Sequence, residues 1–219
     1  MNRGLLVFDL DGTLLDTLDD LAASLNHALA AFGLPTRSRE EVQGFIGNGV
    51  RLMVRRALPP EASAETERQV FAAFAAYYSE HCADLTRPYA GIAGLLDRAR
   101  RGGFATAVVS NKSHREVQTL CDHFFPGLLD MAAGERPGLA RKPAPDLTRL
   151  VLRDLGFSAE QACYIGDSPV DIETARNAGL ECVCVSWGFR GRDELVRAGA
   201  RRIADSPQEL AALLGIGGE

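Results

Sequence analysis

The sequence predicts an α/β protein: a Rossmann-like parallel sheet with helices on both faces, interrupted by a small helical insertion. Three observations support this fold class. Residues 5–8 form a short apolar run with the length of a buried strand. From residue 88 onward, apolar runs of about four to six residues alternate with helical patterns, as they do in parallel sheets. Between these two parts, residues 16–86 carry helical patterns alone.

The elements follow in order along the chain. Leu18, Leu21 and Leu25 recur at helical spacing, and Gly33 ends their helix. In the insertion we expect helices near residues 17–32, 39–44, 50–58 and 62–82. In the second half we expect helices near 92–101, 113–122, 146–155, 171–178 and 207–214, and strands near 105–110, 128–132, 162–165 and 182–185. The expected domains are therefore an α/β core of residues 1–15 and 87–219 and a helical domain of residues 16–86.

The composition narrows the classes of function. The chain has 219 residues, of which 46% are hydrophobic, and a net charge of -5. This length and apolar content suffice for one large buried core with a small additional domain. A mildly acidic chain offers no clustered basic face for nucleic acid, and no apolar run approaches the roughly 20 residues of a membrane span. The N-terminus runs directly into a strand, without a signal peptide, so we expect a cytoplasmic protein. We expect no nucleic-acid or membrane partner, and a monomer or homodimer.

The stretch Asp9-Leu10-Asp11-Gly12 directly follows the first predicted strand. Side chains alternate along a strand, so Asp9 and Asp11 point the same way if the extended backbone continues. Two carboxylates that close repel each other unless a cation or a proton lies between them. Gly12 permits a tight turn or a close backbone approach. The same residues could open a calcium-binding EF-hand loop, but the preceding strand argues against it, as does Asp20 at the twelfth position, where that loop has Glu.

Further polar residues follow later strands. One predicted strand ends in Ser110-Asn111-Lys112, and another is followed by Gly166-Asp167-Ser168. Between these two strands, a Lys142-Pro143 turn precedes the helix that leads into the second of them. In open α/β sheets, ligands bind outside the carboxyl ends of the strands. Carboxylates with bound waters are ligands that Mg²⁺ prefers, and a hydroxyl and an ammonium are donors suited to phosphate oxygens. An Asp at such a site can also act as a nucleophile and form an aspartyl-phosphate.

The choice of basic residues adds a second signal. The chain has 22 arginines but only two lysines, Lys112 and Lys142. Lysine supplies a compact, flexible ammonium, which the planar guanidinium of arginine does not. Both lysines lie beside predicted strand ends, and we interpret them as functional.

Together, these motifs resemble the four motifs of the haloacid dehalogenase (HAD) superfamily. They are Asp9-x-Asp11-Gly12-Thr13, Ser110 at a strand end, Lys142, and Gly166-Asp167-Ser168-x-x-Asp171, in the order of that superfamily and over nearly the whole chain. The helical insertion after the first motif resembles the C1 cap of the superfamily, and the α/β part resembles its core. The opening motif, Gly47-Asn48-Gly49 in the insertion, and Asp171-x-x-x-Ala175-x-x-Ala178-Gly179 are most similar to the phosphoglycolate phosphatase branch.

The resemblance implies a Mg²⁺-dependent phosphatase that hydrolyses a small-molecule phosphomonoester, with 2-phosphoglycolate as the first candidate. Asp9 would attack phosphorus, and Asp11 would act as general acid and base. The metal would be held by Asp9, the backbone carbonyl of Asp11 and Asp167, with Asp171 beside these ligands. Lys142 would take part in catalysis. The residues implied to bind the substrate and its phosphoryl group are Gly12, Thr13, Ser110, Asn111 and, in the cap, Arg51 as the partner of a substrate carboxylate.

Two other functions stay open. A phosphomutase of the same superfamily, similar to β-phosphoglucomutase, would use the same core and differ in the cap. A non-catalytic binding module with the same fold would usually have lost the nucleophile or a metal carboxylate, whereas every expected catalytic position is filled here. A phosphonate hydrolase would need a lysine in the cap, and residues 16–88 contain none.

Overall fold

The computed structural model describes residues 4–217. The chain forms two compact units. One combines the chain up to residue 16 with the chain from residue 88 onward, and the other consists of residues 17–87. The larger unit is α/β and the smaller one is helical.

The larger unit is built on a six-stranded sheet in which the neighbouring strands are parallel. In sheet order, the strands are β5 (Met131–Glu135), β4 (Phe104–Ser113), β1 (Gly4–Phe8), β6 (Ala162–Gly166), β7 (Glu181–Val185) and β8 (Ile203–Ala204). β1 is an inner strand, in which Leu5 pairs with Ala105 of β4 and with Ala162 of β6. Its apolar residues 5–8 are at most 2% exposed, as expected for a parallel strand that is covered on both faces. The predicted fold class is confirmed.

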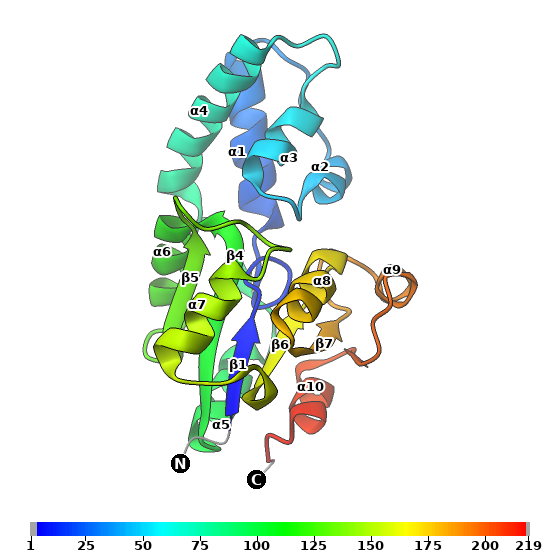
Figure 1. Cartoon of the computed structure of the whole chain (residues 1–219). Coiled ribbons are helices and arrows are strands. Elements are labelled where there is room, and N and C mark those ends of the chain that lie inside the picture. Colours follow the sequence, from blue (N-terminus) through cyan, green and yellow to red (C-terminus); the bar gives the residue numbers. More distant parts are fainter. Residues whose placement is uncertain (1–3, 218–219) are drawn as a thin grey trace. The chain divides into compact units, whose positions relative to one another are not determined.

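Helices cover both faces of this sheet (Figure 1). α7 (Asp146–Leu155) and α8 (Pro169–Ala178) lie on one face, where Val151 and Ala175 join a core cluster with Val7 and Tyr164. α5 (Ile92–Arg101) and α6 (His114–Phe124) lie on the other face. A fully buried Val or Leu side chain contributes roughly 1.5–3 kcal/mol, so the two layers of helices stabilise the sheet from both sides. The 3₁₀ helix η1 (Ala159–Gln161), α9 (Arg192–Arg197) and α10 (Pro207–Leu214) complete the unit.

The structure differs from the predicted elements in short and polar segments. β4 continues through polar residues to Ser113, beyond its predicted end at 110. β5 lies at 131–135 rather than 128–132, because the turn before it is held by Thr106, whose hydroxyl donates to the carbonyl of Leu128 at 2.7 Å. The sequence does not predict α9, β8, or the paired strands β2 (Leu15–Asp16) and β3 (Arg87–Pro88). Elements this short carry too little periodicity to be recognised.

The smaller unit contains α1 (Leu18–Ala31), α2 (Arg39–Phe45), α3 (Val50–Ala57) and α4 (Ala64–His81). α1 packs along α4. Leu25 of α1 and Phe74 and Tyr78 of α4 are buried, and the two aromatic rings stack at 5.4 Å. Ser38 begins α2 with a capping box, in which its hydroxyl and the Glu41 carboxylate each accept a backbone N–H from the other residue.

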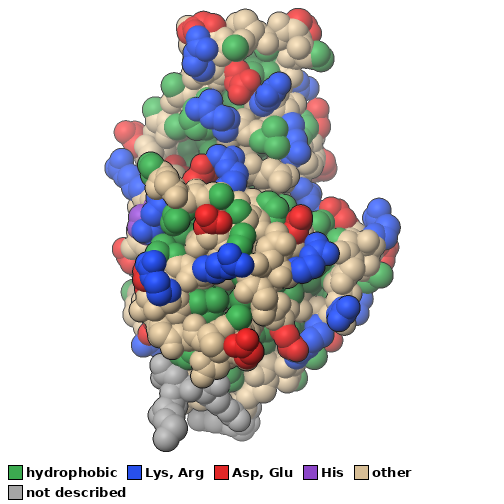
Figure 2. Space-filling model, in the orientation of Figure 1, with side chains coloured by type: hydrophobic (Ala, Val, Ile, Leu, Met, Phe, Trp, Pro, Cys, Tyr) green, Lys and Arg blue, Asp and Glu red, His purple; other side chains and the backbone are tan. Residues whose placement is uncertain are grey.

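The visible surface mixes charges of both signs. On the face in Figure 2, the side chains of Lys and Arg are interspersed with those of Asp and Glu. The chain has 29 acidic and 24 basic residues, and on this face neither sign gathers into one broad patch. Among the described helices, none combines the length and the hydropathy that a membrane span requires.

A buried carboxylate ties the last segment of the helical unit to its first helix. Asp20 of α1 is 2% exposed. Its carboxylate oxygens accept hydrogen bonds from the backbone N–H of Leu85, at 2.9 and 3.1 Å, and of Thr86, at 2.8 Å. Hydrogen bonds to an ionised acceptor are shorter and stronger than neutral ones. Asp20 thereby holds residues 85–86 against α1.

Replacement of Asp20 by Ala is expected to lower the free energy of unfolding by about 2–4 kcal/mol, because the buried N–H of Thr86 and the partly buried N–H of Leu85 lose a charged acceptor. The neighbouring Asp19→Ala is the matched control. The Asp19 side chain is 50% exposed and pairs with Arg39 at the surface, where such a pair contributes at most about 1 kcal/mol. Urea unfolding followed by circular dichroism measures both variants. Equal losses in the two would contradict this role of Asp20.

Candidate active site

The first side of the site is the turn that follows β1. The backbone N–H of Asp9 donates to the carbonyl of Ile165 at 2.8 Å, so pairing with β6 continues one residue beyond the strand. Gly12 adopts a φ of 83°, which favours glycine. A Cβ at this position would lie 2.3 Å from Oδ2 of Asp167. Position 12 therefore requires glycine for two reasons: the backbone conformation of the turn and the close approach of Asp167.

The second side is the junction of β6 and α8. Asp167 follows the last residue of β6, and Ser168 is the N-cap of α8. The hydroxyl and the backbone N–H of Ser168 donate to Oδ2 of Asp171, at 2.6 and 3.1 Å. Pro169 occupies the first helical turn, where its missing N–H is tolerated. The start of the helix thus fixes the Asp171 carboxylate beside Asp167.

The third side holds Lys142, which is 4% exposed. Its Nζ lies 2.7 Å from Oδ1 of Asp171 and 2.9 Å from Oδ1 of Asp9. The backbone of Lys142 is held in turn by the side-chain amide of Asn111, which donates to its carbonyl at 3.1 Å and accepts from its N–H at 2.8 Å. These two hydrogen bonds, to the N–H and the carbonyl of the same residue, orient the lysine toward both carboxylates.

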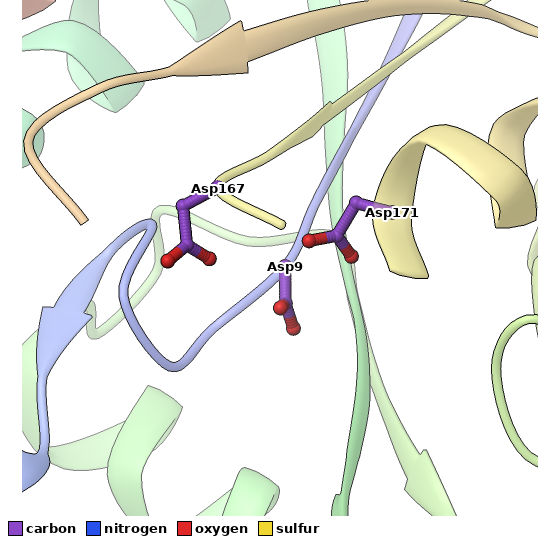
Figure 3. A group of neighbouring side chains, drawn as sticks. All are labelled: Asp9, Asp167 and Asp171. Atoms are coloured by element: carbon purple, nitrogen blue, oxygen red, sulfur yellow. The ribbon is translucent and has the colours of Figure 1, made fainter. Parts of the chain in front are cut away.

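Three carboxylates converge at this edge of the sheet (Figure 3). Asp9, Asp167 and Asp171 each offer an oxygen within 4.8 Å of the other two. All three are buried, with exposed fractions of 8%, 2% and 0%. Oxygen donors in this number suit a hard cation such as Mg²⁺. Both oxygens of Asp171 already accept hydrogen bonds from Lys142 or Ser168, and both oxygens of Asp167 accept them from the Thr13 hydroxyl or the backbone N–H of Phe189.

The charges at the site are not balanced by the protein alone. Burial raises the pKa of Asp9 from 3.8 to about 7; Lys142 lowers it, and Asp171 and Asp11 raise it. Burial, with Asp171 and Asp9, also holds the pKa of Asp167 well above its ordinary value. Burial alone would lower the pKa of Lys142, but Asp171 and Asp9 outweigh it and keep the ammonium charged. A cation beside Asp9 and Asp167 would relieve this repulsion, so the residues present fit a metal ion.

The remaining predicted residues of the α/β unit lie around these groups. The Thr13 hydroxyl donates to Oδ1 of Asp167 at 3.3 Å. Ser110 is 2% exposed, and its hydroxyl accepts the backbone N–H of Lys112 at 3.2 Å. Oδ1 of Asp11 lies 2.9 Å from Nζ of Lys112. The structure therefore brings the predicted residues of this unit to one edge of the sheet.

Arg51 belongs to the helical unit. It lies in the first turn of α3 and is exposed. Its guanidinium carbon is 4.3 Å from the centroid of the Phe71 ring, a distance typical of a cation–π contact. Binding of a substrate carboxylate by Arg51 stays a prediction.

We did not predict a role for the loop after β7, which closes the site from the fourth side. The backbone N–H of Phe189 donates to Oδ2 of Asp167 at 2.7 Å, and Nε1 of Trp187 donates to the carbonyl of Thr13 at 3.1 Å. A Cβ at Gly188 would lie 2.2 Å from the carbonyl of Gly12. Two signals in the sequence point to this loop: it follows a strand at its carboxyl end, and it carries the single tryptophan of the chain.

The family profile described as haloacid dehalogenase-like hydrolase matches residues 6–185, which is most of the chain. The chain belongs to this family. It is 34% identical to a phosphoglycolate phosphatase of Haemophilus influenzae over 96% of this chain and 97% of the relative. It is 32% identical to phosphoglycolate phosphatase 1 of Pseudomonas aeruginosa over 94% of this chain and 78% of the relative.

Solved structures support the same assignment. The crystal structure of a phosphoglycolate phosphatase candidate from Lactobacillus delbrueckii subsp. bulgaricus is 36% identical, with a TM-score of 0.92 and complete coverage of both chains. The resemblance to the phosphoglycolate phosphatase branch of the haloacid dehalogenase-like hydrolases is therefore confirmed. The enzyme class that the motifs indicate, a phosphoric monoester hydrolase, is confirmed with it.

The raised pKa of Asp9 predicts a pH-dependent stability of the metal-free protein. Between pH 3.8 and about 7, folded Asp9 binds more protons than unfolded Asp9 does, so its contribution to stability falls as the pH rises through this window. Asp9→Asn does not titrate. The free energy of unfolding of Asp9→Asn, relative to wild type, is therefore expected to be higher at pH 8 than at pH 5 by a few kcal/mol, since one pKa unit corresponds to about 1.4 kcal/mol.

Urea titrations in the presence of a chelator at both pH values measure this difference. Asp19→Asn serves as the control, because the Asp19 side chain is 50% exposed and its replacement should have nearly the same effect at both pH values. A relative stability of Asp9→Asn that does not change with pH would contradict the prediction.

Proposed function

We propose that this protein is a Mg²⁺-dependent phosphatase that hydrolyses a small-molecule phosphomonoester through an aspartyl-phosphate on Asp9, and that its substrate is 2-phosphoglycolate. The observation that carries the proposal is the buried group at the end of β1, where the ammonium of Lys142 joins Asp9 and Asp171 at 2.9 and 2.7 Å. The full-length similarity to phosphoglycolate phosphatases supports the substrate.

The first half-reaction forms the covalent intermediate. A carboxylate oxygen of Asp9 attacks phosphorus, and the bond between phosphorus and the ester oxygen breaks. Asp11, two residues along the same turn, gives a proton to the departing oxygen, which leaves as an alcohol. Lys142 keeps the Asp9 carboxylate in place and adds positive charge where the phosphoryl oxygens would lie.

The second half-reaction restores the enzyme. Asp11, now deprotonated, takes a proton from a water molecule whose oxygen attacks phosphorus. The bond between phosphorus and the Asp9 oxygen breaks, and inorganic phosphate leaves. One carboxyl group thus serves as acid and then as base, and the proton balance closes over the two steps.

The metal fits the acidic side of this site. Asp9, Asp167 and the backbone carbonyl of Asp11 would hold Mg²⁺, and Asp171 would support them through Lys142 and Ser168. When bound, the ion supplies positive charge that offsets the charge of the phosphoryl group. The raised pKa values of Asp9 and Asp167 support this ligand set, because they arise from burial first and from the neighbouring carboxylates second, and a cation would offset both effects.

The donors around the phosphoryl group would be Ser110, Thr13 and the backbone at Gly12. The family resemblance implies that Asn111 binds the phosphoryl group, but in this proposal its role is indirect. Both ends of its amide already bond to the backbone of Lys142, so it would act on the phosphoryl group chiefly by orienting that lysine. Arg51 of the helical unit would meet a substrate carboxylate, as the predicted cap requires.

Phosphate release from a panel of esters tests the proposal. The panel contains 2-phosphoglycolate, glycerol phosphate, a hexose phosphate and p-nitrophenyl phosphate, each with Mg²⁺ and with chelator. We expect the highest kcat/KM for 2-phosphoglycolate, loss of turnover on chelation, and a loss of more than about a thousandfold in Asp9→Asn, because the nucleophile is gone.

Asp19→Ala is the activity control, since it removes a surface carboxylate and should leave turnover unchanged. Mass spectrometry of acid-quenched enzyme should find the phosphoryl group on the peptide that contains Asp9. Strong release that prefers another ester would retain the phosphatase and reject the substrate. Folded wild-type protein that releases no phosphate from any ester would reject the proposed function.

A further inference from the structure

The other lysine of the chain, Lys112, has no part in the chemistry described so far. Its side chain is nevertheless one of the most buried charged groups, with the residue 3% exposed. Within residues 4–217, the buried cationic side chains are Lys112 and Lys142, while the described arginines are all at least partly exposed. Burial of an ammonium is costly unless a charged partner compensates it. A chain with 22 arginines and two lysines therefore places both lysines in one buried site.

Each of the two lysines forms an ion pair with one carboxylate of the first motif. Nζ of Lys142 lies 2.9 Å from Oδ1 of Asp9, and Nζ of Lys112 lies 2.9 Å from Oδ1 of Asp11. The pair on Asp11 is nearly as enclosed as the pair on Asp9, with side-chain exposures of 2% for Lys112 and 16% for Asp11. Screening by solvent is weak at such a place. Each carboxylate of the motif thus faces an ammonium of its own.

The backbone that carries Lys112 is set by its surroundings. The pairing of β4 with β5 shifts register between Val109 and Ser113, and such an irregularity re-aims side chains at the end of a strand. The N–H of Lys112 donates to the hydroxyl of Ser110. A Cβ at Gly134 of β5 would lie 2.6 Å from the carbonyl of Lys112. The neighbouring strand therefore packs directly against this peptide, and the direction of the side chain follows from the sheet.

We propose that Lys112 is a positioning residue, whose ammonium holds the Asp11 carboxylate in the place from which Asp11 exchanges protons with the leaving group and with water. The inference rests on the proposed function, in which Asp11 is the general acid and base. Lys112 acts on the reaction through Asp11, as Lys142 acts on the Asp9 carboxylate. A compact ammonium suits this role better than a planar guanidinium, which spreads its charge over a wider fork.

The kinetic consequence follows from this indirect role. Lys112→Met, which keeps the unbranched side chain up to its last atom and removes the charge, is expected to lower kcat by roughly tenfold to a hundredfold, a part of the 10²–10⁴-fold that general acid–base catalysis contributes. KM should stay within about threefold, since substrate binding is not its task. A rise in KM with unchanged kcat would mean that Lys112 contacts the substrate, and would overturn the inference.

Two comparisons separate positioning of Asp11 from a structural role. In the Asp11→Asn background, Lys112→Met should lower kcat by less than about threefold further, because residues that act as a unit are not additive. With p-nitrophenyl phosphate, whose leaving group needs little protonation, the loss in kcat/KM should be at least about fivefold smaller than with an alkyl phosphate. The same loss in both backgrounds and with both esters would overturn the inference.

Arg202→Met is the matched control. Arg202 pairs with Glu181 at 3.1 Å, at the amino end of β7 and thus at the opposite edge of the sheet. Its replacement should leave kcat and both comparisons unchanged. If Lys112→Met does not fold by circular dichroism, Lys112→Arg takes its place, with the charge kept and its position displaced. Wild-type enzyme without phosphatase activity would reject the proposed function, whereas active wild type with equally active Lys112 variants would reject this inference alone.

Discussion

The structure depends on one electrostatic constraint, the repulsion among carboxylates that the parallel sheet gathers at a single edge. Asp9 and Asp167 follow neighbouring strands, and Asp171 follows one helical turn later. Without compensation, buried charges of one sign destabilise the fold. The ammonium of Lys142, 2.7–2.9 Å from two of these carboxylates, compensates part of the charge. Burial, together with the neighbouring carboxylates, raises the pKa values of Asp9 and Asp167, and a metal ion would offset the negative charge that remains.

The same contacts that satisfy this constraint also build the local structure. Asp171 caps α8 through Ser168 and at the same time accepts a hydrogen bond from Lys142. Asp167 accepts the N–H of Phe189 and so fixes the loop after β7. Gly12 leaves the space into which Asp167 fits. Folding and chemistry therefore use the same atoms, so the loss of one group would disturb both.

The arrangement also explains why a haloacid dehalogenase-like hydrolase can place its chemistry on short segments. β1 is an inner strand whose residues 5–8 are almost fully buried, and it presents Asp9 and Asp11 from a rigid base. The partners of those two carboxylates come from the end of β4 and from the segment before α7. Hydrogen bonds such as those of Asn111 to the backbone of Lys142 hold these short segments in place, so little conformational freedom is left to lose when a substrate binds.

By itself, the sequence determined the fold class, because apolar runs such as residues 5–8 and 162–165 predict buried strands. It also determined which residues meet at the edge, since the carboxyl ends of parallel strands lie together. The short elements α9 and β8 and the closing loop with Trp187 leave no such local pattern. Only the tertiary structure decided which group each side chain contacts: Asn111 bonds the backbone of Lys142, and Lys112 pairs with Asp11. Those partners are distant in the chain, and their contacts arise from the order and register of the strands, which local periodicity does not encode.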